Sequence, residues 1–308
     1  MKRGLILIPY ANKEAYKAGV NLCSSNRLEV YLKNCCVACM SAKQNACQQA
    51  DVALVTNIDI PNSYKTILEG NEIKIIKADF DDFNFGGNYM WALAFYKLCA
   101  LKHVLLETNY DYYAYLDSDV YVQSDFENIW KECDSHIMMY DICHGLQVEH
   151  YRHFLDEIKN FTKNIGGGYN DITHYGGEFF AAKKEDAVMF MSECQQVYAQ
   201  MTKADFKTTH GDEFIISLAA VKFNVKNAGA YIYRFWTGSF RLISTCYKYN
   251  PVTILHVPAE KEYGMLKLYN KYISKGKIPT KKNVYRLLHL NRRSLRTVVA
   301  QIALKLGK

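Results

Sequence analysis

DYYAYLDSDVYV, residues 111–122, joins an uninterrupted apolar run to two closely spaced carboxylates. Residues 112–116 are aromatic or aliphatic throughout, which is typical of a parallel strand buried on both faces. Side chains two residues apart point the same way in extended chain, so Asp117 and Asp119 can converge beyond the carboxyl end of this strand. Open α/β sheets usually bind ligands at that end. Two hard oxygen ligands fit a small divalent cation and leave coordination positions that a diphosphate can fill.

Apolar runs and helical stretches alternate along the chain on either side of this segment. We predict strands at residues 5–10, 51–56, 72–77 and 137–141, and helices at about 15–48, 88–106 and 148–163. Such alternation indicates βαβ units and a parallel sheet. The 308 residues are therefore expected to form an α/β protein, as one large domain or two small ones.

The acidic pair is followed by VYV at 120–122 and by DFENIW at 125–130. A short acidic triplet also occurs at solvated turns, so the pair alone does not identify a metal site. With its flanks, the block resembles the LYLDSDVLV…DLxxLW block of the GT-A glycosyltransferases, especially the retaining family 8 enzymes. There the Asp-x-Asp motif binds the manganese ion of a nucleotide-sugar. The resemblance implies a GT-A (Rossmann-like) fold, with a mixed, mostly parallel sheet flanked by helices, and Mn²⁺ (or Mg²⁺) at Asp117 and Asp119.

A second segment, THYGGEFFAA at 173–182, contains a glycine pair that lets the backbone approach a ligand closely. It resembles the YLGGFFGG strand of family 6 galactosyltransferase-like enzymes and the FNSGVLL strand of family 8, which line the donor-sugar or acceptor pocket. The resemblance implies substrate contacts at Gly176 and Gly177. Glu178 has no counterpart in either pattern, so it is either an acceptor for a sugar hydroxyl or an exposed strand residue. Three glycines just upstream, at 166–168, predict a flexible loop, which can close over a ligand or be a plain connection.

The third segment, THGDEFIIS at 209–217, opens an apolar helix. Its last six residues line up with DESHLN of family 6 and DQDxLN of family 8. In those families the first acid holds donor-sugar hydroxyls and the second position lies beneath the anomeric carbon, which implies catalytic roles for Asp212 and Glu213. This chain inserts Gly211 and ends the motif in Ser217 rather than Asn. Stabilisation of the helix N-terminus by two acids is the structural alternative.

The fourth segment, TILHVPAEKEYG at 253–264, resembles the family 8 segment ILHxxGxxKPW. The resemblance implies that His256 completes the metal site and that Lys261 neutralises the diphosphate, although Lys261 follows the histidine by five residues rather than six. Imidazole with carboxylates suits Mn²⁺ better than Mg²⁺. A lone histidine after a strand can also be purely structural.

The nucleotide is expected at the end of the first strand. Tyr10 and Ala11 in the turn that follows are the first candidates for the uridine site, together with Ser118 between the two acids and Lys261. The acidic turn at residues 79–82 is a weaker candidate.

Charge is unevenly distributed along the chain, which carries +7 in total. Residues 261–308 hold 13 Lys and Arg and one acid, which gives +12 and leaves −5 for residues 1–260. Apolar residues keep helical spacing over residues 281–308, so this tail is expected to be a basic amphipathic helix on an anionic membrane. A terminal helix docked on its own domain or on a partner subunit is the alternative. Nucleic acid is disfavoured because the remaining chain is acidic and carries no recognition motif.

The location is predicted from the first residues and the cysteines. The initial apolar run is too short for a secretory signal, and no segment has the apolar length of a membrane span. Cys35, Cys36 and Cys39 lack a second metal-ligand pair and are expected to be reduced thiols. We therefore expect a cytoplasmic protein, peripheral at the inner face of the membrane.

The sequence predicts a GT-A catalytic domain at residues 1–264 and the basic tail at 265–308. Residues 1–122 would form the nucleotide-binding half and 123–264 the half for sugar and acceptor. The predicted activity is retaining, metal-dependent transfer of a hexose from a UDP-sugar to a glycan or lipid-linked acceptor. The alternatives are an inverting enzyme with Asp212 or Glu213 as general base, and a non-catalytic carbohydrate-binding or scaffold protein. A sugar nucleotidylyltransferase is disfavoured because IPYAN at 8–12 is not a Gly-rich loop with Arg.

Overall fold

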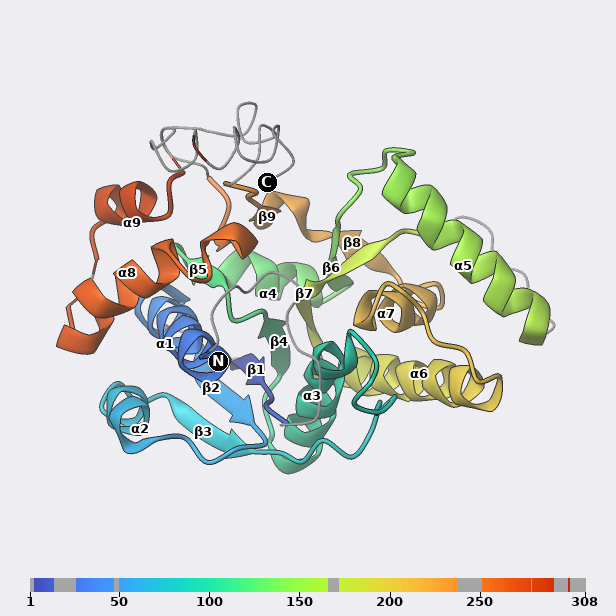
Figure 1. Ribbon diagram of the computed structural model, residues 1–308, viewed down its shortest axis with the longest axis horizontal. Coiled ribbons are helices and arrows are strands. Elements are labelled where there is room, and N and C mark those ends of the chain that lie inside the picture. Colours follow the sequence, from blue (N-terminus) through green and yellow to red (C-terminus); the bar gives the residue numbers. More distant parts are fainter. Residues whose placement is uncertain are drawn as a thin grey trace.

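The computed structural model describes residues 3–13, 26–46, 50–165, 172–237, 251–277, 279–290 and 299. Its centre is a seven-stranded sheet in the order β3-β2-β1-β4-β7-β6-β8 (Figure 1). These strands are β1 (Gly4–Tyr10), β2 (Ala50–Thr56), β3 (Lys74–Lys77), β4 (Tyr112–Leu116), β6 (Ile137–Asp141), β7 (Tyr175–Lys183) and β8 (Val225–Asn227). Only β7 runs antiparallel to its neighbours, β4 and β6. The predicted mixed, mostly parallel sheet is confirmed.

Side chains alternate along β1, and this gives the sheet a core on each face. Leu5 and Leu7 belong to the core on one face, whereas Ile6 and Ile8 belong to the core on the other. β4 alternates in the same way, and all of its residues are buried, as the apolar run predicts. Each fully buried aliphatic side chain contributes about 2 kcal/mol, so the two central strands are held firmly in place.

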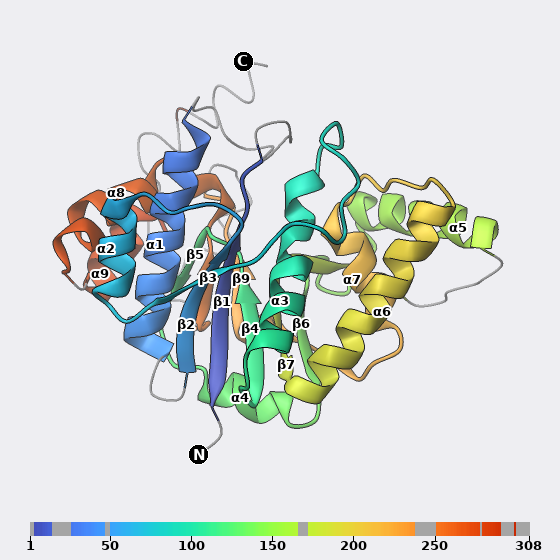
Figure 2. The ribbon, with the colours of Figure 1, turned by 90° about the horizontal axis from the view of Figure 1, so that it is seen from below.

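Helices cover both faces of this sheet (Figures 1 and 2). One side carries α1 (Arg27–Ala46), α2 (Asn62–Glu69), α8 (Gly264–Lys271) and α9 (Lys281–Leu287). The other side carries α3 (Tyr96–Glu107), α5 (Glu149–Ile165), α6 (Lys184–Lys203) and α7 (Asp212–Ala220). A short helix, α4 (Glu127–Cys133), follows the acidic segment.

Two helix predictions need correction in their extent. The helix expected at 88–106 is a turn followed by the 3₁₀ helix η1 (Ala92–Phe95), and it becomes α-helical only at Tyr96. The stretch expected to be helical at 15–48 contains α1 from Arg27, while residues 14–25 and the glycines at 166–168 lie outside the described residues. Within α1, Cys36 is buried and unbridged, and burial raises the pKa of its thiol to about 12.

A second, three-stranded sheet brings the fourth motif to the acidic pair. It has the order β5-β10-β9 and consists of β5 (Val120–Val122), β10 (Ile254–His256) and β9 (Ile232–Arg234). β10 is antiparallel to β5, and its register sets His256 opposite Val120. The histidine, which follows Asp119 by more than a hundred residues in sequence, therefore lies next to it.

The C-terminal helices pack against the domain. α8 lies along α1, and α9 packs on α8. Val284 and Tyr285 of α9 and the following Leu288 are buried in the core. The single helix predicted over 281–308 is wrong in its extent. α9 ends at Leu287, and His289 has a positive φ of 55°, which interrupts the helical conformation. Residues 291–298 and 300–308 lie outside the described part of the chain, and the domain boundary at residue 264 stays a prediction.

Within the described ranges, no helix combines the length and the apolar content needed to cross a membrane.

Candidate active site

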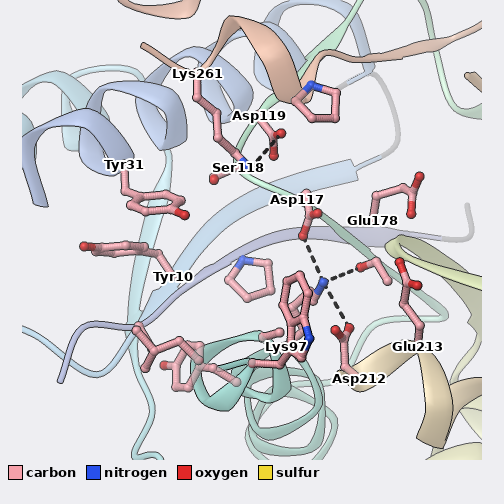
Figure 3. A pocket seen from close by; sticks show the side chains of 18 of the residues that line it. Tyr10, Tyr31, Lys97, Asp117, Ser118, Asp119, Glu178, Asp212, Glu213 and Lys261 are labelled. Atoms are coloured by element: carbon pink, nitrogen blue, oxygen red, sulfur yellow. Dashed lines mark hydrogen bonds and ion pairs between the residues drawn. The ribbon is translucent and has the colours of Figure 1, made fainter. Parts of the chain in front are cut away.

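A cavity of about 500 Å³ lies where β1 and β4 end (Figure 3). It is lined by nearly all the site residues that the sequence predicts, namely Tyr10, Ala11, Asp117, Ser118, Asp119, Gly177, Glu178, Asp212, Glu213, His256 and Lys261. Gly176 and residues 79–82 do not line it. A Cβ at Gly176 would collide with the Glu178 carboxylate and with Ile142, so this glycine allows tight packing around β7.

Asp117, Asp119 and His256 form a compact group of potential metal ligands. One donor atom of each lies within 4.8 Å of the others. His256 Nε2 is 3.3 Å from Asp119 Oδ2 and 3.9 Å from Asp117 Oδ2. The two sheets explain why these residues lie together. Both acids follow the end of β4, and the register of β10 on β5 sets the histidine opposite Val120, next to Asp119.

The chemistry of this group fits a divalent cation. Asp119 is buried, and its Oδ2 faces two nitrogens, Lys261 Nζ at 3.1 Å and His256 Nε2 at 3.3 Å. Burial would raise the pKa of Asp119, but Lys261 and His256 hold it well below its usual value. Burial would likewise lower the pKa of His256, but Asp119 and Glu178 raise it to about 9. A buried, ionised carboxylate beside a second carboxylate and an imidazole nitrogen is a donor set that fits a divalent metal ion.

Lys97 of α3 connects the acidic pair to the start of α7. Its Nζ lies 3.1 Å from Asp117 Oδ1 and 3.0 Å from Asp212 Oδ2, and it donates to the carbonyl of Gly177 at 2.7 Å. A Cβ at Gly177 would collide with the ends of both the lysine and Asp212 side chains, so a larger residue would displace this pair. Although burial lowers it, the pKa of Lys97 lies well above its usual value because of Asp117 and Asp212. The lysine is therefore a fixed positive charge in the middle of the cavity.

Glu178 is neither exposed nor free to bind a hydroxyl group. It is 1% exposed, and Arg234 of β9 contacts both of its oxygens, with Nε 2.7 Å from Oε1 and Nη2 2.6 Å from Oε2. His256 Nδ1 is 3.2 Å from the same Oε1. Despite burial, Arg234 and His256 hold the pKa of Glu178 far below its usual value. The expectation of an exposed strand residue was wrong, because the glutamate faces the three-stranded sheet rather than solvent.

Asp212 and Glu213 begin α7 in different electrostatic surroundings. Glu213 Oε2 lies 2.9 Å from His174 Nε2, and its Oε1 lies 3.3 Å from Arg234 Nη2. Burial opposes the effect, but these partners lower the pKa of Glu213 to about 2. The pKa of Asp212 instead rises to about 6, chiefly through burial, with Lys97 acting against the rise.

The inserted Gly211 explains how α7 starts. It has a φ of +63° and lies so close to Trp91 that a Cβ would be 3.2 Å from the indole. Glycine adopts a positive φ without strain. No side chain caps the helix at Gly211. Because both acids of the first turn line the cavity, helix stabilisation alone does not account for them.

The opposite end of the cavity is aromatic. Tyr10 and Tyr31 stack with their ring centroids 5.5 Å apart at an angle of 28°. Lys261 Nζ lies 6.0 Å from the centre of the Tyr31 ring, between this stack and Asp119 (Figure 3). Ser118 and Ala11 are buried in the same wall. A flat apolar wall beside a cation suits a nucleobase joined to phosphates.

Tyr31, Lys97, His174 and Arg234 contact the predicted site residues but were not themselves predicted from the sequence. Lys97 and Arg234 each stand alone in an apolar run, FYKLCAL and YIYRFW. A single charge in such a run is a signal that it will be buried against an opposite charge. Tyr31 and His174 carry no comparable signal.

The fold is similar to that of a solved glycosyltransferase. The crystal structure of mouse xyloside xylosyltransferase 1, in its apo form, matches with a TM-score of 0.51 at 12% sequence identity, covering 83% of this chain and 97% of that chain. No protein-family model matches the sequence, and no curated protein matches it. The chain thus has the GT-A-type glycosyltransferase fold. At this identity the likeness concerns the fold alone.

Proposed function

We propose that the protein is a metal-dependent glycosyltransferase that moves a hexose from a UDP-sugar to a glycan or lipid-linked acceptor, with retention of configuration. The observation that carries the proposal is one cavity in which a group of metal ligands adjoins two acids, the buried Asp212 and the partly exposed Glu213. A nucleotide-sugar needs both, because its diphosphate carries negative charge and its sugar offers hydroxyl groups. The glycosyltransferase fold supports the same conclusion.

The metal end of the cavity would act on the leaving group. Asp117, Asp119 and His256 would hold Mn²⁺ (or Mg²⁺), since mixed carboxylate and imidazole donors favour Mn²⁺. When bound, the ion supplies Lewis-acid stabilisation of the departing diphosphate. Lys261 adds fixed positive charge on the same side. We assign the uridine to the wall that Tyr10 and its neighbours form.

The sugar would occupy the space between the metal end and α7. Gly177 leaves room for Lys97 and Asp212 to lie against β7, and Asp212, paired with Lys97, would hold hydroxyl groups of the sugar. Glu213 would stabilise positive charge as it develops at the anomeric carbon.

An inverting reaction is the second candidate, and one observation favours it. The pKa of Asp212, about 6, is suited to a general base near neutral pH, whereas that of Glu213, about 2, is not. A non-catalytic carbohydrate-binding protein is less compatible with this cavity, because it has no need of two carboxylates and an imidazole that converge on one point.

Chelation should abolish the activity. We expect the protein with a panel of nucleotide-sugars to release UDP in Mn²⁺, and UDP release to fall to background after EDTA and return when Mn²⁺ is restored. The measurement is UDP by chromatography, with and without added acceptor sugars. Release that persists in EDTA would exclude metal dependence, and no release from any donor would favour the binding-protein alternative.

We also propose that the basic end of the chain binds an anionic membrane surface at the cytoplasmic face. The structure sets where a deletion can begin, because Tyr285 and Leu290 are buried and must be kept. Removing residues 291–308 deletes five basic residues: Arg292, Arg293, Arg296, Lys305 and Lys308. Each contributes about 1 kcal/mol near an anionic surface.

The full chain should therefore float with phosphatidylserine vesicles at low salt and be released at high salt, whereas the protein ending at residue 290 should not float. UDP release with a soluble acceptor should be unchanged by the deletion. Failure of the full chain to bind at low salt would leave the tail as a structural segment only.

A further inference from the structure

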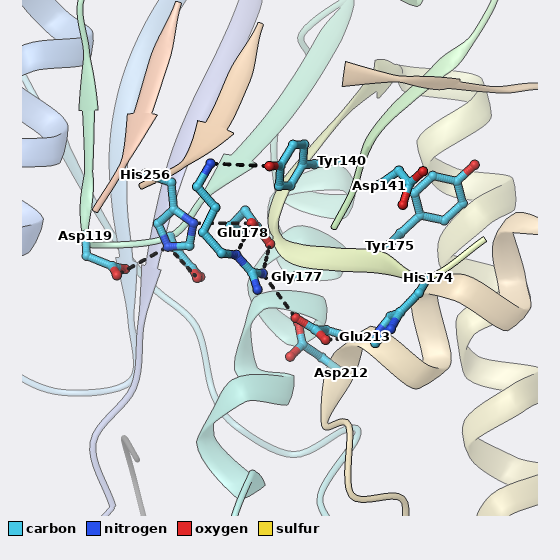
Figure 4. Close-up of polar contacts among 12 residues, drawn as sticks. Asp119, Tyr140, Asp141, His174, Tyr175, Gly177, Glu178, Asp212, Glu213 and His256 are labelled. Carbon is cyan, nitrogen blue, oxygen red and sulfur yellow. Dashed lines mark hydrogen bonds and ion pairs between the residues drawn. The ribbon is translucent and has the colours of Figure 1, made fainter. Parts of the chain in front are cut away.

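A continuous row of charged side chains links the metal end of the cavity to its sugar end (Figure 4). His256 contacts Asp119 through Nε2 at 3.3 Å and Glu178 through Nδ1 at 3.2 Å. Arg234 contacts Glu178 through two nitrogens, at 2.6 and 2.7 Å, and reaches Glu213 at 3.3 Å. Glu178 is thus the one member of the row that touches both the histidine and the arginine.

Glu178 cannot take part in the reaction by direct contact. Its side chain is 0% exposed, and both carboxylate oxygens are engaged. A carboxylate in such a place is unfavourable unless charged partners compensate its lost hydration. Whatever the residue does for the reaction, it does through His256 and Arg234.

The strand register shows why a carboxylate is needed at this point. Arg234 and His256 are direct neighbours on the parallel strands β9 and β10. The amide of Asp117 donates to the carbonyl of Glu178 at 3.0 Å, which anchors the glutamate beside the acidic pair. Two basic side chains at paired positions of neighbouring strands repel each other unless an acid lies between them.

We infer that Glu178 is a positioning residue that orients His256 for the metal and Arg234 for Glu213. An ionised carboxylate only accepts hydrogen bonds, so Nδ1 of His256 must donate to it, and this directs Nε2 toward Asp117 and Asp119. The same carboxylate fixes the plane of the guanidinium group, which leaves one Nη2 hydrogen directed toward Glu213. The inference rests on the proposed metal-dependent transfer.

The test is direct Mn²⁺ binding to the full chain, measured by electron paramagnetic resonance of free Mn²⁺. Glu178→Gln should weaken Mn²⁺ binding about 10- to 100-fold, the usual effect of losing a carboxylate that supports a ligating histidine. Arg234→Lys, which keeps the charge beside Glu178, should bind Mn²⁺ within about threefold of wild type yet lose turnover, because lysine cannot bridge to Glu213. Glu193→Gln is the matched control, since Glu193 is a buried acid paired with Lys222 outside the cavity.

The result distinguishes the inference from the proposed function. Wild-type protein that does not bind Mn²⁺ would overturn the metal-dependent function itself. Wild type that binds Mn²⁺, with a folded Glu178→Gln that binds it equally well, would overturn only the positioning role. If Glu178→Gln lacks a cooperative thermal transition, the double variant Glu178→Gln with Arg234→Gln is used, because it removes both buried charges together. The double variant should show the same weakening of Mn²⁺ binding.

Discussion

Replacing Asp119 by asparagine is expected to lower turnover by about a thousandfold, the upper range for loss of one key electrostatic group. Asp119 is 1% exposed and faces both Lys261 and His256. An amide is a poorer ligand for a hard cation than a carboxylate. It would also leave the lysine and the histidine without their shared acid. Both Mn²⁺ binding and nucleotide-sugar binding should weaken, and UDP release in Mn²⁺ measures the combined effect.

Asp59→Asn is the control, because Asp59 is fully exposed and pairs with Lys77 in a surface contact of small energy. It should retain wild-type turnover. Asp117→Asn should behave like Asp119→Asn, and His256→Ala should have a milder effect. Near-normal turnover of Asp119→Asn in Mn²⁺ would show that the Asp-x-Asp segment is not the metal site.

The central strand and one wall of the cavity could be predicted from the sequence because both depend on local properties. Residues 112–116 are apolar without interruption, and such a run must be buried on both faces. The two acids that follow leave the strand at its carboxyl end, where the structure has the cavity. No contact distant in sequence is needed for either conclusion.

Arg234 and Lys97 could not be assigned to the site in this way. Arg234 reaches Glu178, which lies 56 residues away, only because β9 joins the small sheet and β7 is antiparallel in the large one. Lys97 of α3 reaches Asp212 at the start of α7, which follows it by more than a hundred residues. A lone charge in an apolar run indicates that a partner exists, but the identity of that partner depends on tertiary structure.

The end of the chain shows a different limit. Apolar residues at helical spacing beyond residue 281 fit a helix on a membrane and a helix docked on its own domain equally well. In the structure the first of them, Val284 and Leu288, pack into the core. Periodicity shows that one face of a helix is covered. It does not show whether a membrane, the same domain or a partner covers that face.

Glu213→Gln is expected to lower turnover by at least about a hundredfold while the donor KM changes little. Glu213 lies between Arg234 and His174, and the amide keeps the shape of the side chain but loses the negative charge near the reacting centre. Asp212→Asn should raise the donor KM as well, because Asp212 pairs with Lys97, which also contacts Asp117. Steady-state kinetics with varied donor separates the two effects, and Glu193→Gln is again the control that should match wild type.

The anomeric configuration of the product, determined by NMR, decides what these acids do. A retained configuration with a strong Glu213→Gln effect supports charge stabilisation beneath the anomeric carbon, whereas near-wild-type turnover of that variant would remove Glu213 from the mechanism. An inverted configuration would require a general base. Asp212 would then be the base, since its pKa of about 6 is above the ordinary value and that of Glu213, about 2, is too low. A base acts only when deprotonated, so activity would be full above pH 7 and would fall as the pH drops through about 6, a fall that Asp212→Asn would eliminate.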